Sequence, residues 1–177
     1  MTHRLVVEKE RGGQALSPEI AGVAMTSSSL PSEVLLKPTI SLRVASVLTF
    51  IHCIAHTVRG VLSAPAHGEA EIAVIETMKS HSFSFGGFSR TYWDFHLGYG
   101  WFLSFILLVD GLLFWYLAGV CKTDSIVIRP VVALFAFNFL MMAIVSWKFF
   151  ALGPVIIELL IASSLVAAFA TMARRTM

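Results

Sequence analysis

The chain has 177 residues, of which 56% are hydrophobic and only 14% are charged, and its mean hydropathy is +0.78. Soluble domains carry about a quarter charged residues, so this balance excludes an ordinary soluble domain and indicates an integral membrane protein. The formal net charge of +2 gives no basic patch to suggest nucleic acid, and the expected partners are the lipid bilayer, other membrane subunits and a small apolar molecule.

Residues 1–40 differ in composition from the rest of the chain. Charged residues, a Gly12-Gly13 pair and a serine run at 27–29 follow one another without a sustained hydrophobic period. The segment also lacks the apolar core and small-residue cleavage site of a secretory signal peptide. We therefore predict a poorly ordered cytoplasmic tail over residues 1–40, followed by a first span that acts as an uncleaved signal anchor.

Four stretches are apolar and long enough to cross a bilayer, which takes about 20 helical residues. They cover residues 41–60, 95–120 (or a slightly earlier start), 131–147 and 155–172. The sequence thus predicts an all-α fold. It is a four-transmembrane-helix bundle over residues 41–177, with a long external loop between the first two helices.

The external loop contains one stretch with helical spacing. Ile72, Ile75 and Met78 recur at three-residue intervals with acidic residues among them. This pattern is typical of a short amphipathic helix over residues 69–78 that lies on the membrane surface, and a plain surface loop is the equally weighted alternative. Gly86-Gly87 is interpreted as a turn in this loop.

Lys and Arg near the span ends predict the orientation. If the N-terminus is cytoplasmic, six basic side chains lie inside and four outside. This bias favours cytoplasmic positions for both termini, in a plasma membrane or a cell inner membrane. The inner set is Lys37, Arg43, Lys122, Arg129, Arg174 and Arg175, and the outer set is Arg59, Lys79, Arg90 and Lys148.

Asp110 lies in the middle of the second span. An unpaired carboxylate at the centre of a bilayer costs roughly 3 kcal/mol, so such an acid is a functional candidate that needs a partner. At 1.5 Å per residue, Asp110 lies roughly 15 Å from the cytoplasmic end of its span, and His52 roughly 16 Å from the same end of the first span. Asn138 on the third span comes within about one turn of that level. We predict a midplane layer of His52, Asp110 and Asn138.

A second polar layer is predicted nearer the outside. His56 lies one turn beyond His52 on the same helical face, and Glu158 lies at a similar depth on the fourth span, so these two are expected to meet. On the second span, spacings of 3, 4, 3 and 4 predict one inward-facing seam made of His96, Tyr99, Leu103, Ile106 and Asp110. Together the two layers would form a polar column inside an apolar bundle.

Structural explanations compete with a functional column. Paired with His52, Asp110 would fix the helix register, since interhelical polar contacts contribute under about 1 kcal/mol but still specify packing. Glu158 near the start of its helix would be favoured by the helix macrodipole alone. Several residues at the outer end of the second span fit an interfacial belt, namely Tyr92, Trp93, Asp94, His96, Tyr99 and Trp101.

A metal or haem site is a further alternative, because His52-x-x-x-His56 places two imidazoles on one helical face. Asp110 or Glu158 would be a third zinc ligand, and haem would take His96 from another helix. The spacing alone is a weak signal. We therefore assign no metal ligand and leave any cofactor unknown.

A longer motif begins in the external loop. Arg-Thr-Tyr-Trp-Asp-Phe at residues 90–95 is preceded by Met78-Lys79-Ser80, Phe83 and Phe85 and followed by Gly98-Tyr99-Gly100. With Ile51-His52 and His56-Thr57 of the first span, these residues resemble a family of small, uncharacterised bacterial four-helix integral membrane proteins. The resemblance covers about residues 42–177, implies the four-helix topology and draws attention to residues 90–95, without an established activity. A more distant similarity in plan is to the EXPERA sterol-isomerase fold, from which no motif aligns and no residue is carried over.

The sequence supports two hypotheses of function. The preferred one is a non-enzymatic membrane module that binds an apolar ligand or forms part of a membrane complex, with candidate ligand contacts at Arg90, Trp93, Asp94, His96, Tyr99 and Asn138. The alternative is a small intramembrane enzyme acting on a lipid-like or isoprenoid substrate, with two acid/base pairs formed by His52 with Asp110 and by His56 with Glu158. A transporter would require a homodimer, since four helices are few for alternating access.

Overall fold

The computed structural model describes residues 38–63 and 66–174, and within that part four helices are long and apolar enough to cross a membrane. They are α1 (Pro38–His56, continued by the π-helical turn η1, Thr57–Leu62), α3 (Tyr92–Val120), α4 (Ser125–Phe149) and α5 (Leu152–Arg174). The predicted all-α four-helix bundle is confirmed. The predicted tail, residues 1–40, lies outside the described residues except for its last three, which begin α1.

All four long helices begin before the first residue of the span predicted for them, and in α3 and α4 a capping side chain marks the start. Thr91 caps α3: its Oγ1 accepts from the Asp94 N–H (3.1 Å), and Asp94 Oδ2 accepts from the Thr91 N–H (2.8 Å). Asp124 caps α4 by accepting from the Val127 N–H (3.2 Å). Pro130 lies inside α4, in its second turn, where its missing N–H removes one backbone hydrogen bond of the helix.

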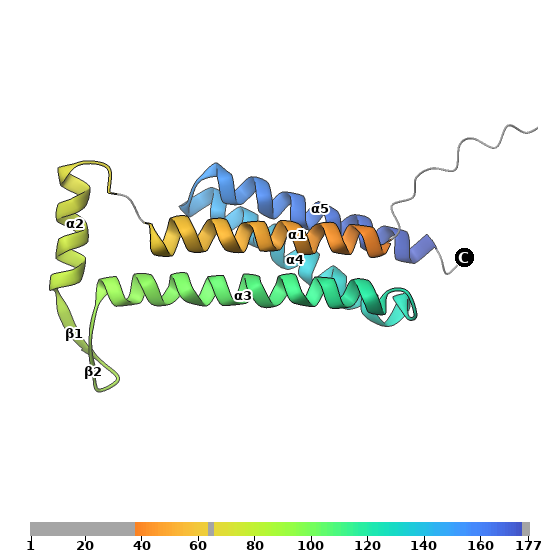
Figure 1. Cartoon of the computed structure of the whole chain (residues 1–177), viewed down its shortest axis with the longest axis horizontal. Coiled ribbons are helices and arrows are strands. Elements are labelled where there is room, and N and C mark those ends of the chain that lie inside the picture. The colour runs from red at the N-terminus through yellow and green to blue at the C-terminus, as the bar shows by residue number, and fades with distance from the viewer. Residues whose placement is uncertain (1–37, 64–65, 175–177) are drawn as a thin grey trace, which may run out of the picture. The chain divides into compact units, whose positions relative to one another are not determined.

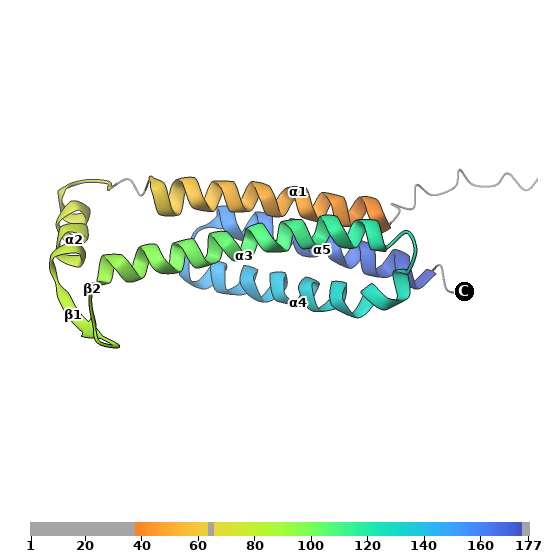
Figure 2. The same cartoon turned by 60° about the horizontal axis from the view of Figure 1, so that its bottom comes forward.

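The four long helices pack around one apolar core (Figures 1 and 2). α1 lies between α3 and α5, and α5 packs along α4. Leu42, Leu107, Phe139 and Leu165 are fully buried where these helices meet. α3 and α4 approach each other much less closely, and the ring of Phe114 fills the space between them, 5.2 Å from Phe135 and 5.9 Å from Phe139 between centroids.

Small residues allow the close approach of α1 and α3. A Cβ added to Gly111 would lie 2.9 Å from Cε1 of Phe50, and one added to Gly100 would lie 2.8 Å from Cγ2 of Val61. The Ser46 hydroxyl donates to the Gly111 carbonyl oxygen across the same interface (2.7 Å). Helix contact through glycine and serine is the packing expected in a bilayer, where apolar side chains gain nothing by leaving lipid.

The connection between η1 and α3 is more ordered than a loop. It contains α2 (Glu69–Ser80) and a hairpin of β1 (Ser82–Phe85) and β2 (Phe88–Thr91), in which Phe85 pairs with Phe88. The predicted helix over residues 69–78 therefore forms. The Gly86-Gly87 turn is confirmed too, with positive φ angles of 57° and 82° that favour glycine. In Figure 1, α2 runs across the end of the bundle rather than along it.

Candidate functional site

Buried polar residues form a row along the inner face of α1. Ser41, Ser46, Thr49 and His52 are each at most 5% exposed, in a helix whose other faces are largely apolar. The Thr49 hydroxyl donates to the Ala45 carbonyl oxygen one turn earlier in the same helix (2.8 Å). His52 has no such local partner, and its Nδ1 is buried without a hydrogen bond. The ring is thus held inside the bundle with an unused polar atom.

At the end of α1 that continues into η1, the row becomes a hydrogen-bonded network with α3. His56 donates from Nε2 to the Gly100 carbonyl oxygen (3.1 Å), and Thr57 donates to Ser104 Oγ (2.8 Å). The Cys53 thiol donates to the Ser104 carbonyl oxygen (3.3 Å). The predicted contact between His56 and Glu158 is wrong. His56 bonds to Gly100 of α3, and Glu158 accepts its hydrogen bond from Ser146 of α4.

Asp110 is buried, with 7% of its surface exposed, but it has no hydrogen bond or ion pair with any residue that the structure describes. Its predicted pairing with His52 is therefore not formed. Helical spacing explains the geometry: Gly111 faces α1, and the neighbouring Asp110 is turned by about 100° towards the side of α3 that carries Phe114. The carboxyl group of Asp110 is consequently buried in the bundle but does not face α1.

The predicted seam on α3 is partly wrong. His96 is exposed, and Tyr99 and Ile106 are 69% and 53% exposed, so these three side chains face outward. The inward-facing row runs one position later along the helix, from the half-buried Gly100 through the buried residues Ser104, Leu107, Gly111 and Phe114, at spacings of 4, 3, 4 and 3. Leu103 is half-buried beside it.

The placement of Asn138 in the midplane layer is also wrong. This side chain is exposed on α4, and its Nδ2 lies 3.7 Å from the Met142 sulfur one turn away. The face of α4 that enters the bundle carries Val132, Ala136, Phe139, Ala143 and Ser146 instead. Since Asn138 directly precedes Phe139, it is rotated out towards lipid.

Glu158 on α5 is 2% exposed, which makes it the most deeply buried acid among the described residues. Its Oε1 accepts from the Ser146 hydroxyl on α4 (3.0 Å), whereas its Oε2 is buried without a hydrogen bond. His52, Asp110 and Glu158, on α1, α3 and α5, are therefore buried ionisable side chains that form no hydrogen bonds or ion pairs with one another. Across the described ranges, no three His, Cys, Asp or Glu side chains come together as a group that could hold a metal ion.

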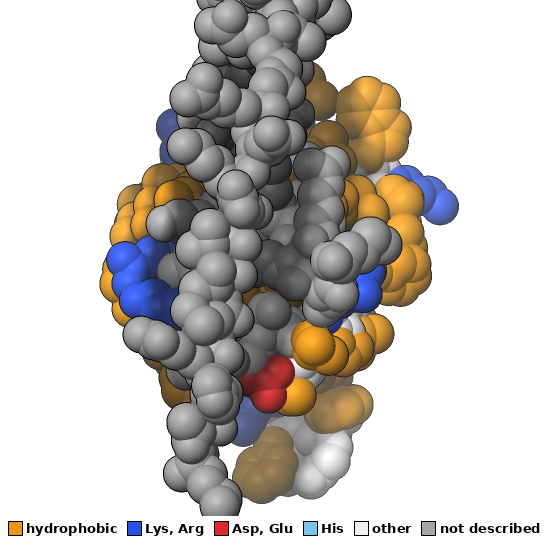
Figure 3. All heavy atoms as spheres, turned by 90° about the vertical axis from the view of Figure 1, so that its right-hand side faces the viewer, with side chains coloured by type: hydrophobic (Ala, Val, Ile, Leu, Met, Phe, Trp, Pro, Cys, Tyr) orange, Lys and Arg blue, Asp and Glu red, His pale blue; other side chains and the backbone are white. Residues whose placement is uncertain are grey.

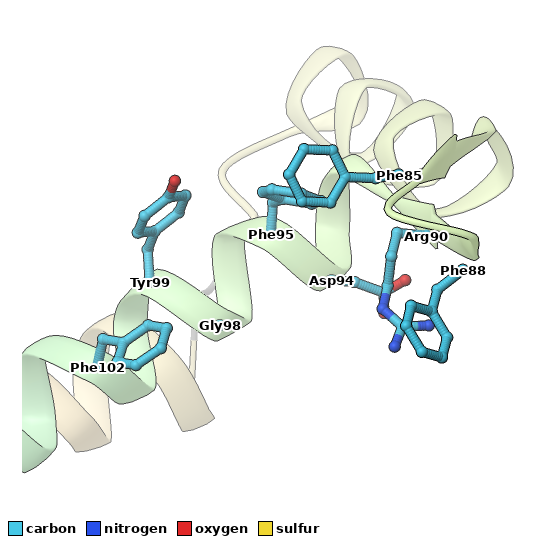
Figure 4. A pocket seen from close by; sticks show the side chains of 8 residues that line it. All are labelled: Phe85, Phe88, Arg90, Asp94, Phe95, Gly98, Tyr99 and Phe102. Atoms are coloured by element: carbon cyan, nitrogen blue, oxygen red, sulfur yellow. The ribbon is translucent and has the colours of Figure 1, made fainter.

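The remaining candidates lie at the N-terminal end of α3. Arg90, Asp94 and Tyr99 line a cavity of about 390 Å³ beside the hairpin, and Figure 4 shows the aromatic side chains around them. The aromatic lining consists of Phe85, Phe88, Phe95, Tyr99 and Phe102. Trp93 points elsewhere, with its ring 5.1 Å from that of His96 and 5.4 Å from the Lys79 ammonium group.

Sequence reasoning missed the four phenylalanines of this pocket and the serines of the bundle. The signal for the pocket was the sequence of the hairpin, because two short aromatic stretches on either side of Gly86-Gly87 predict a pair of strands there. Small residues at heptad spacing were the missing signal for the inner face of α3. The sequence matches no protein-family model, and comparisons with curated proteins and with solved structures find no significant match.

Proposed function

We propose that this multi-pass membrane protein binds a small apolar ligand inside its four-helix bundle, through a hydroxyl or carbonyl group of that ligand. One observation carries the proposal: His52, Asp110 and Glu158 are all more than nine-tenths buried, and each has polar atoms without a protein partner. Buried polar groups are normally hydrogen-bonded, so a set of unsatisfied ones indicates a missing partner. A subunit docked from outside would reach the lipid-facing surface, whereas these groups face inward.

The α3–α4 seam is the proposed entrance. These two helices meet chiefly through Phe114 and its aromatic neighbours on α4, whereas α4 packs closely on α5. Asp110 lies one turn from Phe114 on the same side of α3. A ligand that moves the Phe114 ring aside would enter directly from the bilayer and meet the carboxyl group of Asp110.

The acid/base alternative has less support. Its two pairs require His52 beside Asp110 and His56 beside Glu158, and neither pair is hydrogen-bonded within the part of the chain that the structure describes. A ligand-binding role needs no such pairing, because each group can contact a different part of a bound molecule.

The test compares small molecules that co-purify with the full-length protein and two variants. Asp110→Asn keeps the size of the side chain and removes its charge. Asn138→Leu is the matched control, because it removes a polar group from the same predicted level but from the lipid-facing side. We expect mass spectrometry of extracts to show one apolar compound enriched with the wild type and with Asn138→Leu. Asp110→Asn should reduce it by at least about tenfold with little change in Tm.

Two outcomes would count against the proposal. The first is an equal amount of the compound with Asp110→Asn. The second is a wild-type extract that contains only the bulk lipids of the membrane. A lower Tm for Asp110→Asn without any change in bound compounds would instead assign Asp110 to helix packing.

We further propose that both termini face the cytoplasm, in a plasma membrane or a cell inner membrane. Three basic residues share one end of the bundle: Arg43 on α1, Lys122 in the turn between α3 and α4, and Arg129 on α4. Figure 3 views that end and shows Lys and Arg side chains beside an apolar flank. An excess of basic residues on short cytoplasmic segments supports this orientation.

A further inference from the structure

The pocket beside the hairpin combines a cation, an anion and aromatic walls. Its aromatic side chains include Phe85 and Phe95, whose ring centroids are 5.3 Å apart, and Tyr99, whose ring lies 6.2 Å from Phe95. Arg90 and Asp94 lie together on the other side, next to Phe88 (Figure 4). A volume of about 390 Å³ falls within the usual range for small-ligand sites.

Arg90 and Asp94 form no ion pair with each other and keep binding capacity free. The Arg90 guanidinium donates once, from Nη1 to the Ser89 carbonyl oxygen (2.8 Å), and lies over the Phe88 ring at 5.2 Å. Its other N–H groups have no partner among the residues that the structure describes. Asp94 uses Oδ2 to cap α3, which leaves Oδ1 available. The pocket therefore presents a positive and a negative group side by side, each with hydrogen-bonding positions that the protein does not use.

The length of α3 places this pocket at the level of the lipid headgroups. At 1.5 Å per residue, the 29 residues of α3 extend roughly 43 Å, whereas the hydrocarbon core of a bilayer is about 30 Å thick. The excess is at the N-terminal end, because α3 runs past the outer ends of α4 and α5 in Figures 1 and 2. Tyr92 and Trp93 at that end are residue types that favour the membrane interface.

We propose that this pocket binds the headgroup of a zwitterionic phospholipid. The Arg90 guanidinium pairs with the phosphate, which it matches in charge and shape. Asp94 Oδ1 and the aromatic faces of Phe95 and Tyr99 surround the ammonium group of choline or ethanolamine, as aromatic cages do for such cations. Phe102, further along α3, contacts the start of the acyl chains.

The charge pattern selects against the other classes of lipid. An anionic headgroup without an ammonium group would bring a second negative charge towards Asp94. An uncharged ligand would gain nothing from Arg90 or Asp94, which are both exposed to solvent when the pocket is empty. The pocket does not include Asp110 or the interior of the bundle, so a failure of either proposal would leave the other untouched.

The test measures lipid binding to the full-length protein in detergent by native mass spectrometry. The probes are phosphatidylcholine, phosphatidylethanolamine and phosphatidylglycerol with identical acyl chains. We expect the wild type to bind the better of the two zwitterionic lipids at least about fivefold more tightly than phosphatidylglycerol. Asp94→Asn should remove that preference, since Asn keeps an oxygen to cap α3 but loses the charge. Arg90→Gln should weaken all three lipids. Arg59→Gln, which removes an exposed arginine of η1, is the matched control and should change nothing.

Equal or tighter binding of phosphatidylglycerol by the wild type would overturn the proposal. An unchanged lipid preference in Asp94→Asn would overturn it as well. If Asp94→Asn fails to fold, Tyr99→Leu provides a second measurement, because Tyr99 is 69% exposed and contributes little to packing. Its expected effect is a loss of about threefold in binding of phosphatidylcholine without a loss for phosphatidylglycerol.

Discussion

Replacing Gly111 by alanine would place a methyl group between α1 and α3 at their closest approach. The new carbon would lie 2.9, 3.0 and 3.1 Å from Cε1, Cδ1 and Cζ of Phe50. Carbon atoms in good contact are about 3.5–4.0 Å apart, so the Phe50 ring or the helix must move by roughly half an ångström or more. A shift of α3 would also stretch the hydrogen bond from Ser46 to the Gly111 carbonyl oxygen.

The size of the effect follows from two opposing terms. Overpacking of this kind costs about 1–3 kcal/mol, and alanine in place of a helical glycine returns up to about 1 kcal/mol. Gly119→Ala is a matched control in the same helix, since a Cβ at Gly119 meets no atom within 4 Å. We therefore expect Gly111→Ala to be destabilised relative to Gly119→Ala by about 1–3 kcal/mol, which is the steric cost alone.

The assay is reversible unfolding of the reconstituted protein by titration with sodium dodecyl sulfate. A double-mutant cycle with Phe50→Ala identifies the source of the cost, because removal of the ring should cancel most of the penalty of Gly111→Ala. Equal stabilities for Gly111→Ala and Gly119→Ala would refute the close contact between α1 and α3. Additive effects of Gly111→Ala and Phe50→Ala would show that the strain arises elsewhere.

Three other substitutions test separate contacts. Ser146→Ala should lower the free energy of unfolding by about 1–3 kcal/mol in the same titration, because Glu158 loses its hydrogen bond. Ser164→Ala is the control, since it removes only a hydrogen bond to the backbone of the same helix. A smaller loss of stability for Ser146→Ala than for Ser164→Ala would contradict this prediction. Thr91→Ala should raise amide exchange in the first turn of α3 and cost about 1 kcal/mol, whereas Thr91→Ser should not. Asp110→Leu should stabilise the ligand-free protein by about 1–3 kcal/mol, since an unpaired buried acid is lost; a destabilised variant would reveal a protein partner for Asp110.

Hydropathy predicted the spans but not the faces of the helices. A span must be about 20 apolar residues long whatever its neighbours, so its position can be found from composition. Which side faces inward is a different question, because lipid and protein core are equally apolar. Tyr99 and Ile106 have the right spacing for a seam and still face outward, whereas Gly100 and Gly111, with no side chain to bury, mark the true interface.

The candidate site was predicted in part. His52, Asp110 and Glu158 were singled out because acids and histidines are rare in spans, and all three are buried. Their pairing was not predictable, because depth fixes the level of a residue on its helix but not its direction. Asn138 illustrates this limit: its estimated depth is within about one turn of that of Asp110, yet its side chain is exposed on α4.

The turn between α4 and α5, formed by Phe150 and Ala151, has a consequence for biogenesis. Two helices joined so tightly are expected to enter the bilayer together as a helical hairpin, and the Ser146–Glu158 hydrogen bond spans only 12 positions of sequence. Glu158 thus meets its hydrogen-bond donor as soon as the last helix is synthesised. The carboxyl group that would be hardest to transfer alone into lipid is accompanied by a partner from the preceding segment, whether or not the first two helices have already assembled.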